Sequence, residues 1–475
     1  MTLSTNHKRS AWVVLVVSSL GLSGCASFSP DGGFGEVQQL TKAHTGLDAR
    51  WNKTEAETSE AQQRVADSLA KPLSVDDAVQ VALLNNRGLQ ASYGELGISE
   101  ADLVQASRVP NPGLSFGRLK RGGDTEIDRG VHFDLARLLV APLVSGIETR
   151  RFEQSRRLAA LNTLSVASET RKAWFMAVAA DESLSYMQEV LKSADAGEEL
   201  AAKLAQAGNW SRLEHAREQG FYADAALNVA RATQARTTAR ERLTRLLGLW
   251  GTQTQFVLPE RLPELPKSPD QFPDIEQQAV GQRLDLQALR AQTQGLAKNL
   301  GLSKVTRVVN VLEVGVARNS YRDAPTSEHG YDISLEIPLF DWGGARVAKA
   351  EAIYMQSVNQ LAQAAIEARS EVREAYQGYR TSHDIVRHYR DEIVPLRKRI
   401  SDENQLRYNG MFISVFDLLA DARAQITAVN GYIESLRDFW LAQSDLQMAL
   451  IGKPAVTPMS GMASTAGTSE SSATH

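Results

Sequence analysis

The chain has 475 residues, of which 43% are hydrophobic and 23% are charged, and its formal net charge is −4 at pH 7. This length could hold two or three domains, and the charge balance excludes a strongly basic nucleic-acid-binding protein. Cys25 is the only cysteine, so internal disulfides and thiolate metal clusters are excluded as well.

Residues 1–24 have the layout of a secretory signal peptide. Lys8 and Arg9 precede an apolar run that ends at Leu22-Ser23-Gly24-Cys25 and is too short to span a bilayer. That ending resembles the bacterial lipoprotein signal, in which the cysteine becomes the lipidated first residue of the mature protein. The alternative is an ordinary signal with a chance cysteine. The residue after it, Ala26, is not the Asp that retains such proteins at the inner membrane, and the resemblance therefore implies the outer membrane.

The first part of the mature chain divides into a leader and a repeat. Residues 25–72 are polar with scattered glycines and predict an extended leader without a core of its own. A first repeat is expected over 73–249. Its opening helix has a capping box that joins Ser74 to Asp77, and it runs toward Val104 before two prolines stop it.

A β-hairpin is expected next in the first repeat. Short strands over 113–119 and 131–135 are separated by the polar loop KRGGDTEID. In the second strand Val131, Phe133 and Leu135 alternate with polar residues, which places them on one face. The hairpin is therefore expected to have an apolar side and a polar side.

Two long helices complete the first repeat. One is expected over about 147–206 and ends at a turn that contains Gly208 and Asn209. Its partner begins at Ser211, with Glu214 three residues later as a capping box, and continues to residue 248. Residues 250–273 contain five prolines and predict a stiff linker without helix.

The second repeat, over 274–453, follows the same order. It starts with a helix to about residue 303 and a strand over 308–318. The strand over 331–337 then alternates Tyr331, Ile333, Leu335 and Ile337 with polar residues. One side of this strand therefore favours hydrocarbon and the other favours water.

A second helical hairpin closes the second repeat. Apolar residues at coiled-coil spacing predict a helix over 344–404, which would be about 90 Å long. The chain turns at Asn409 and Gly410 and returns as a helix whose capping box joins Ser414 to Asp417. The tail over 454–475 is rich in Ser, Thr and Gly and is predicted to be disordered.

The chain thus repeats one order of elements: helix, β-hairpin, long helix, glycine turn, helix. We predict a mostly α fold with duplicated units and a small membrane β-barrel. Two hairpins supply four strands, which cannot close a barrel, and unpaired strand edges are not tolerated in lipid. Three copies would supply twelve strands and a tube of helices that continues them.

Two segments resemble the TolC family of outer-membrane efflux factors. They are the strand exit IPLFDWGGAR over 337–346 and the tip GMFISVFDLL over 410–419, and their order and duplication extend the resemblance over nearly all of the mature chain. The family implies a homotrimeric channel with a twelve-stranded barrel in the outer membrane and a long helical barrel in the periplasm. It also implies a periplasmic adaptor and an inner-membrane pump as partners, with no cofactor and no enzymatic chemistry.

The same resemblance implies site residues at the two helical tips. The family closes its periplasmic end with acidic and hydrogen-bonding residues just after the second glycine turn, and the candidates here are Asn409, Gly410, Phe412, Ser414, Asp417 and Asp421. The first tip, with Gly208, Asn209, Ser211 and Glu214, is the candidate adaptor contact. Asp417 has capping as an alternative role, and which aspartate faces the pore stays open. Because like charges four residues apart repel on a helix, the pair is not explained by helix stability alone.

Other functions are weighed on the same residues. His383 and His388 are five apart and do not share a helix face well, so we expect a solvated surface rather than a metal site. No nucleophile-base or metal constellation indicates an enzyme. A passive duct for small toxic solutes, either metal ions or drugs, is the leading hypothesis. A type I protein-secretion duct and a lipid-anchored coiled-coil scaffold are the alternatives, although a scaffold has no use for two amphipathic hairpins.

Overall fold

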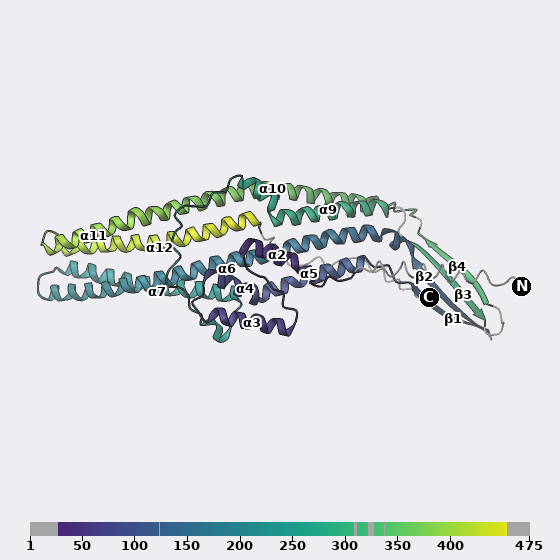
Figure 1. The fold of residues 1–475 in the computed structure, drawn as a ribbon, viewed down its shortest axis with the longest axis horizontal. Coiled ribbons are helices and arrows are strands. Elements are labelled where there is room, and N and C mark those ends of the chain that lie inside the picture. Colours follow the sequence, from purple (N-terminus) through teal and green to yellow (C-terminus); the bar gives the residue numbers. More distant parts are fainter. Residues whose placement is uncertain (1–26, 123, 308–310, 322–326, 337, 454–475) are drawn as a thin grey trace.

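The structure is a computed structural model that describes residues 27–122, 124–307, 311–321, 327–336 and 338–453. The predictions for the signal peptide, Cys25, Ile337 and the tail over 454–475 fall outside these residues. The molecule is elongated, with paired helices at one end and a four-stranded sheet at the other (Figure 1). The shorter helices pack beside the middle of the long ones.

The order of elements over residues 75–247 recurs over residues 275–451, and two further helices precede the first of these units. The first half contains α2 (Phe34–Thr45), α3 (Glu55–Leu69), α4 (Val75–Asn85), α5 (Arg87–Ala106), β1 (Gly113–Arg121), β2 (Asp124–Asp134), α6 (Leu135–Gln206) and α7 (Arg212–Leu247). A short 3₁₀ turn, η1 (Gly251–Thr254), follows. The second half contains α8 (Ile275–Gln282), α9 (Leu284–Val305), β3 (Leu312–Tyr321), β4 (Ser327–Leu335), α10 (Gly344–His388), the π-helical turn η2 (Tyr389–Ile393), α11 (Val394–Asn409) and α12 (Val415–Ile451).

The leader is helical rather than extended, which corrects the prediction for residues 25–72. Helix α3 begins with a complete capping box in which Thr54 pairs with Glu57. Helix α2 packs against α6 and buries Phe34 and Val37. These helices are only weakly apolar by themselves, so the surface that α6 and α4 provide is what makes the helical state favourable.

The first helix of the repeat is broken into α4 and α5 at Asn86. The Asn86 side chain accepts a hydrogen bond from the backbone N–H of Leu89, so it acts as the N-cap of α5. Its amide nitrogen donates to the carbonyl of Leu246 at the end of α7 (2.8 Å). One side chain therefore ends a helix, starts the next and ties both to α7, which apolar periodicity alone does not reveal.

Helix α6 begins twelve residues earlier than the predicted start at residue 147. Asp134 caps it by accepting a hydrogen bond from the N–H of Arg137 (2.8 Å). Pro142 lies inside the helix and removes only one intrahelical hydrogen bond, so it does not end the helix here. The 72 residues of α6 would extend about 110 Å, and α7 packs along its second half.

Helices α10 and α11 are joined through η2 into one rod that reaches Asn409, five residues beyond the predicted end at 404. Pro395 lies in the first turn of α11 and has no N–H to donate to the preceding turn. The backbone widens into a π turn just before that residue. Gly431 of α12 lies against the ring of Tyr389 in this turn, where an added Cβ would come within 2.9 Å of the ring.

The proline-rich linker holds the two halves together. Apart from η1 it is not helical, as predicted, but its apolar side chains enter the core: Phe256, Leu258, Leu262 and Leu265 are buried. The indole N–H of Trp440 donates to the carbonyl of Pro263 (3.1 Å), and His383 contacts the carbonyl of Pro266 (3.1 Å).

His383 is therefore buried, which corrects the surface position predicted for it. Its ring packs edge-on against Phe439, with ring centroids 5.8 Å apart. His388 is exposed, as predicted, and its Nδ1 lies 3.2 Å from Glu392. An isolated histidine at a helix seam is packed as an aromatic residue when a carbonyl from another segment satisfies its ring nitrogen.

The sheet is antiparallel with the order β1-β2-β3-β4, so the hairpins of the two halves pair through β2 and β3. The strands extend further than predicted, and most of the supposed polar loop over 120–128 is paired backbone in β1 and β2. Gly122, with a φ of 63°, supplies the left-handed turn residue that a tight hairpin requires. Strands β1 and β4 form the two edges.

Candidate functional site

The sheet separates apolar and polar side chains onto opposite faces. Residues directly opposite each other in register share a face, and Leu114, Val131, Val316 and Tyr331 form one such row across all four strands. The next row toward the helices contains Phe133, Val314 and Ile333. The exposed fractions of this face are high: 80% for Leu114, 59% for Val316 and 61% for Ile333. This arrangement matches the face predicted for Val131, Phe133, Tyr331 and Ile333.

The opposite face is acidic. Its carboxylates are Glu126, Asp128, Asp134, Glu313, Glu328 and Asp332. Near the hairpin turns, Glu126 accepts hydrogen bonds from the side-chain amide of Asn319 (3.0 Å) and from the hydroxyl of Tyr321 (3.4 Å). Glycine occupies a position of this face that has no room for a side chain, since a Cβ on Gly315 would come within 2.3 Å of Asp332. The sheet thus pairs a hydrocarbon surface with a cation-attracting one.

The two helical tips lie at the end of the molecule away from the sheet (Figure 1). At the first tip Gly208 has a φ of 76° and ends α6 with Asn209. Ser211 and Glu214 then form a complete capping box at the start of α7. The N–H of Ser211 donates to the Glu214 carboxylate at 2.6 Å. The local chemistry predicted for this tip is present.

At the second tip the left-handed residue is Met411 rather than Gly410, which corrects the predicted match with the first tip. Met411 has a φ of 61° and is 93% exposed, whereas Gly410 has a φ of −83°. The turns span residues 207–211 and 410–414, and the left-handed residue is the second in each, so the counterpart of Gly208 is Met411. Gly410 is still needed, because a Cβ there would come within 2.8 Å of the exposed Phe412 ring. The side chain at position 411 therefore projects into solvent.

The two aspartates of the second tip have different surroundings. Asp417 completes the capping box of α12 with Ser414, whose N–H donates to its carboxylate (3.1 Å). Asp421 lies one turn further and is partly exposed. Within the described part of the chain it forms no hydrogen bond or ion pair. The capping role of Asp417 is therefore present in the structure, and Asp421 is available to a group outside the chain.

An ion pair that sequence reasoning missed joins the two helical hairpins near the tips. Arg423 of α12 donates to Glu218 of α7 (3.0 Å), and the guanidinium lies 4.3 Å from the ring centre of Phe221. Glu218 is 2% exposed. Charged residues on long helices usually face solvent, so only the similar distances from the helix starts at Ser211 and Ser414 could have indicated a pair.

A buried cation, Arg283, fixes the end of α12 to the middle of the molecule. The side chain of Arg283 is 2% exposed and forms two hydrogen bonds with Asp285 (2.7 and 3.1 Å) and one with Glu371 of α10 (2.9 Å). It also donates to the carbonyl of Ala449 (3.2 Å). Burial opposes the charge, but the hydrogen bonds that Arg283 donates to Asp285 and Glu371 raise the pKa of Arg283 above its ordinary value.

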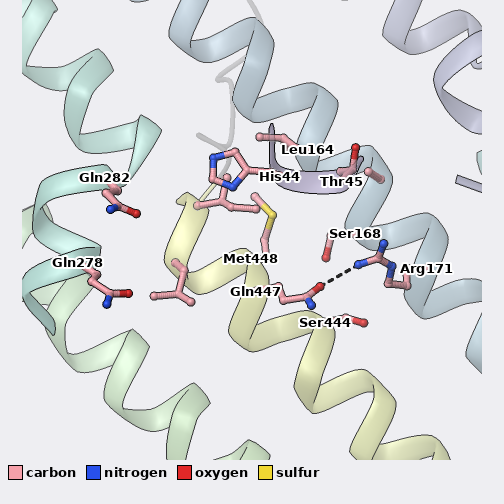
Figure 2. A pocket seen from close by; sticks show the side chains of 13 residues that line it. His44, Thr45, Leu164, Ser168, Arg171, Gln278, Gln282, Ser444, Gln447 and Met448 are labelled. Carbon is pink, nitrogen blue, oxygen red and sulfur yellow. Dashed lines mark hydrogen bonds between the residues drawn. The ribbon is translucent and has the colours of Figure 1, made fainter. Parts of the chain in front are cut away.

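A cavity of about 220 Å³ lies where α2, α6, α8 and α12 meet (Figure 2). Its wall contains His44, Gln278, Gln282 and Met448, and Arg171 donates to Gln447 across one side (2.8 Å). Burial lowers the pKa of His44, which favours the neutral imidazole. The lining thus provides amides, hydroxyls, the Arg171 guanidinium and one imidazole, without a carboxylate that could act as a partner of the imidazole.

No group of three or more His, Cys, Asp or Glu side chains in the described part of the chain is arranged to hold a metal ion. None of the helices among those residues combines the length and the apolarity that crossing a bilayer requires.

Comparison with known proteins adds one curated relative. No protein-family model matches the chain. The chain is 26% identical over 279 residues to the cobalt-zinc-cadmium resistance protein CzcC of Cupriavidus metallidurans. The match covers 57% of this chain and 63% of CzcC, so the chain spans less than two thirds of that relative's length.

Solved structures of channel proteins share the whole architecture. The CmeC outer membrane channel of Campylobacter jejuni gives a TM-score of 0.69 at 17% identity and covers 79% of this chain and 85% of CmeC. CusC, described as forming a transmembrane channel, gives 0.67 at 17% identity with 80% and 92% covered. The chain therefore has the fold of the TolC-type outer-membrane efflux channels.

Proposed function

We propose that this protein is the outer-membrane channel of a tripartite efflux system, a passive duct through which small toxic solutes leave the cell. One observation carries the proposal: a sheet with an exposed apolar face and an acidic face stands at the end of helices about 110 Å long. An envelope scaffold needs the helices only. A duct needs both, because one face must meet lipid and the other must line water.

Closure of the sheet requires further copies of the chain. Strands β1 and β4 have unpaired edges, and lipid does not tolerate unpaired backbone groups. Pairing β4 of one copy with β1 of the next in a ring of three gives twelve strands, a barrel wide enough for a water-filled lumen. The long helices would continue this ring as a periplasmic tube, with the acidic face of the sheet turned inward.

The partners follow from the position of the tips. We propose that a periplasmic adaptor grips the end formed by Gly208, Asn209, Ser211 and Glu214, and that an inner-membrane pump supplies the energy. Metal cations are the favoured solute class, because the polar face carries carboxylates and carboxylate rings favour cations. The name of the relative CzcC, a cobalt-zinc-cadmium resistance protein, supports the same class.

The proposed function is tested in cells that lack the gene. Deletion should raise the cell-associated content of cobalt, zinc or cadmium after a pulse of the metal, and expression of the intact chain should restore the lower level. Unchanged metal content together with normal resistance to toxic organic compounds would show that the chain is no efflux duct. If deletion lowers only the resistance to toxic organic compounds, the exported solutes are drugs and not metal ions.

The lipid anchor is a separate proposal that rests on Leu22-Ser23-Gly24-Cys25. We expect Cys25 to carry the lipid, so that cells fed a labelled fatty acid yield labelled protein. Cys25→Ser should abolish the label and leave the signal peptide attached, whereas Ser27→Ala should be labelled like the wild type. An unlabelled wild-type protein would end the proposal.

The gate proposal concerns Asp417 and Asp421. Three copies would bring up to six carboxylates near the narrowest point of the tube, where they are tolerated only through hydrogen bonds to neighbouring copies or through bound cations. Replacing both with Ala should therefore raise single-channel conductance in a planar bilayer and weaken block by divalent cations.

Two controls separate the gate from the helix cap. Asp417→Ala alone removes the cap and costs about 1 kcal/mol at the helix start. Glu214→Ala removes the matching carboxylate of the other tip. Neither single variant should show the raised single-channel conductance that is expected of the double variant. A closed state that is unaltered when both aspartates are replaced would rule them out as the gate.

A further inference from the structure

A row that contains three basic side chains crosses the apolar face of the sheet. The register places Phe116, Arg129, Arg318 and His329 directly opposite one another on β1, β2, β3 and β4. Arg118 stands in the next row on β1, two residues along on the same face. The described side chains of this face include no Asp or Glu, since the carboxylates of the strands lie on the other face. The carboxylates of the strands are therefore confined to one face.

This basic row is unfavourable without a partner. Like charges directly opposite on neighbouring strands repel, and the strands are only about 4.8 Å apart. Arg129, Arg318 and His329 are exposed, and within the described part of the chain none of them forms an ion pair or a side-chain hydrogen bond. The long stems can lie along the apolar surface while the charged groups reach outward. An external anion that bridges the row would remove the repulsion.

The position of the row along the strands indicates which kind of anion can reach it. The rows on its helix side are apolar and exposed, and the exposed side chains of Phe340 (99%) and Trp342 (57%) belong to the segment between β4 and α10. Between the basic row and the paired ends of the strands lie the row with Arg118 and Ser320 and, on β1 and β2, the pair Lys120 and Thr125. The row thus caps the hydrocarbon belt on the side away from the helices. Groups at that level in a bilayer are lipid headgroups.

We propose that the row of Arg129, Arg318 and His329, with Arg118 beside it, binds the phosphate groups of anionic lipids in the leaflet on the hairpin side. The inference rests on the proposed function, because it requires the apolar face to stand in a membrane. Guanidinium groups bind phosphate oxygens through two parallel hydrogen bonds. From β2 to β4 the row spans about 10 Å, room for two phosphates. The apolar rows beside it would hold the acyl chains, which free phosphate lacks.

The experiment measures lipid binding by the purified full chain in a neutral detergent. Native mass spectrometry gives the number of copies and the number of lipids bound in the same sample. The probes are diphosphorylated lipid A, the same lipid after enzymatic removal of its phosphates, and inorganic phosphate. The variants are Arg129→Gln/Arg318→Gln and the charge-retaining Arg129→Lys/Arg318→Lys. The control is Arg397→Gln, which removes an exposed cation from α11.

We expect the wild type and Arg397→Gln to bind the diphosphorylated lipid at least tenfold more tightly than the dephosphorylated one. The glutamine variant should lose this preference, and the lysine variant should keep part of it. Inorganic phosphate at equal concentration should not compete.

Equal binding of both lipids by the wild type, or an unchanged preference in the glutamine variant, would overturn the proposal. If inorganic phosphate competes fully, the row binds free phosphate and not a lipid, and the proposal is wrong. In each of these outcomes the mass spectrum would still show a trimer. A spectrum that shows only single copies refutes the proposed function instead, so the two failures are distinguishable.

Discussion

An arginine at Ile333 should prevent the sheet from assembling in a membrane. Ile333 is 61% exposed and lies opposite Val314 on the apolar face, one row closer to the helices than Tyr331. A charged residue facing lipid near the middle of a barrel costs about 2–4 kcal/mol per copy, and a closed trimer meets that cost three times. We expect Ile333→Arg to reduce the trimer recovered from membranes severalfold, measured by native gel or mass.

The adjacent residue provides the matched control. Asp332 points to the opposite face, where its carboxylate lies next to Gly315. Asp332→Arg places the same new charge beside carboxylates that line water, so trimer recovery should stay close to that of the wild type. Equal recovery of the two variants would mean that the apolar face does not meet lipid.

Replacement of Arg283 should produce the largest loss of stability in the helical part. Its guanidinium is almost fully buried and holds Asp285 and Glu371, so Arg283→Met leaves Asp285 without its cation and Glu371 with the exposed Lys453 alone. Breaking a buried ion pair by removing one partner costs about 3–5 kcal/mol. Urea unfolding of the purified protein should show this as a clear fall in the midpoint, with Arg283→Lys between the variant and the wild type.

An exposed ion pair between α10 and α8 shows how much burial contributes to the stability effect of Arg283. Arg373 lies 3.2 Å from Glu276, but the two side chains are 61% and 41% exposed. Arg373→Met should cost less than about 1 kcal/mol, since solvent screens such pairs. Equal effects of the two methionine variants would show that the Arg283 cluster is not buried in the assembled protein.

Much of the fold could be predicted because each half of the chain repeats simple periods. Alternation at Tyr331, Ile333 and Leu335 identifies a strand and also its apolar face, since a one-residue slip would exchange the faces. Coiled-coil spacing identifies the long helices. Capping boxes at Ser211 and Ser414 locate the turns to within a residue. These are local signals, and the local chemistry agrees with the tertiary structure.

Where the structure differs from the sequence-based prediction, contacts with a distant segment of the chain determine the local structure. Asn86 breaks a helix because its amide reaches the carbonyl of Leu246 at the end of α7. His383 is buried because the linker brings a carbonyl to its ring. The leader is helical because α6 offers it an apolar surface. None of these contacts is visible in the periodicity of one segment.

The site was predicted more completely in its faces and tips than in its connections. The capping role of Asp417 follows from spacing alone, whereas the pair of Glu218 and Arg423 requires two helices more than 200 residues apart in the chain to meet. The row of Arg129, Arg318 and His329 depends on the register between strands from different halves. Sequence defines the faces of each strand, and the pairing then determines which charges become neighbours.

The claim that three copies of this chain enclose a conducting duct is tested most directly by single-channel recording of the purified full chain in a planar bilayer. The mass of the inserted sample should be measured in the same detergent. We expect a trimeric mass and discrete, cation-selective conductance steps that rise in the Asp417→Ala/Asp421→Ala variant. A monomeric mass, or a trimer that inserts and passes no current in either form, would contradict the duct.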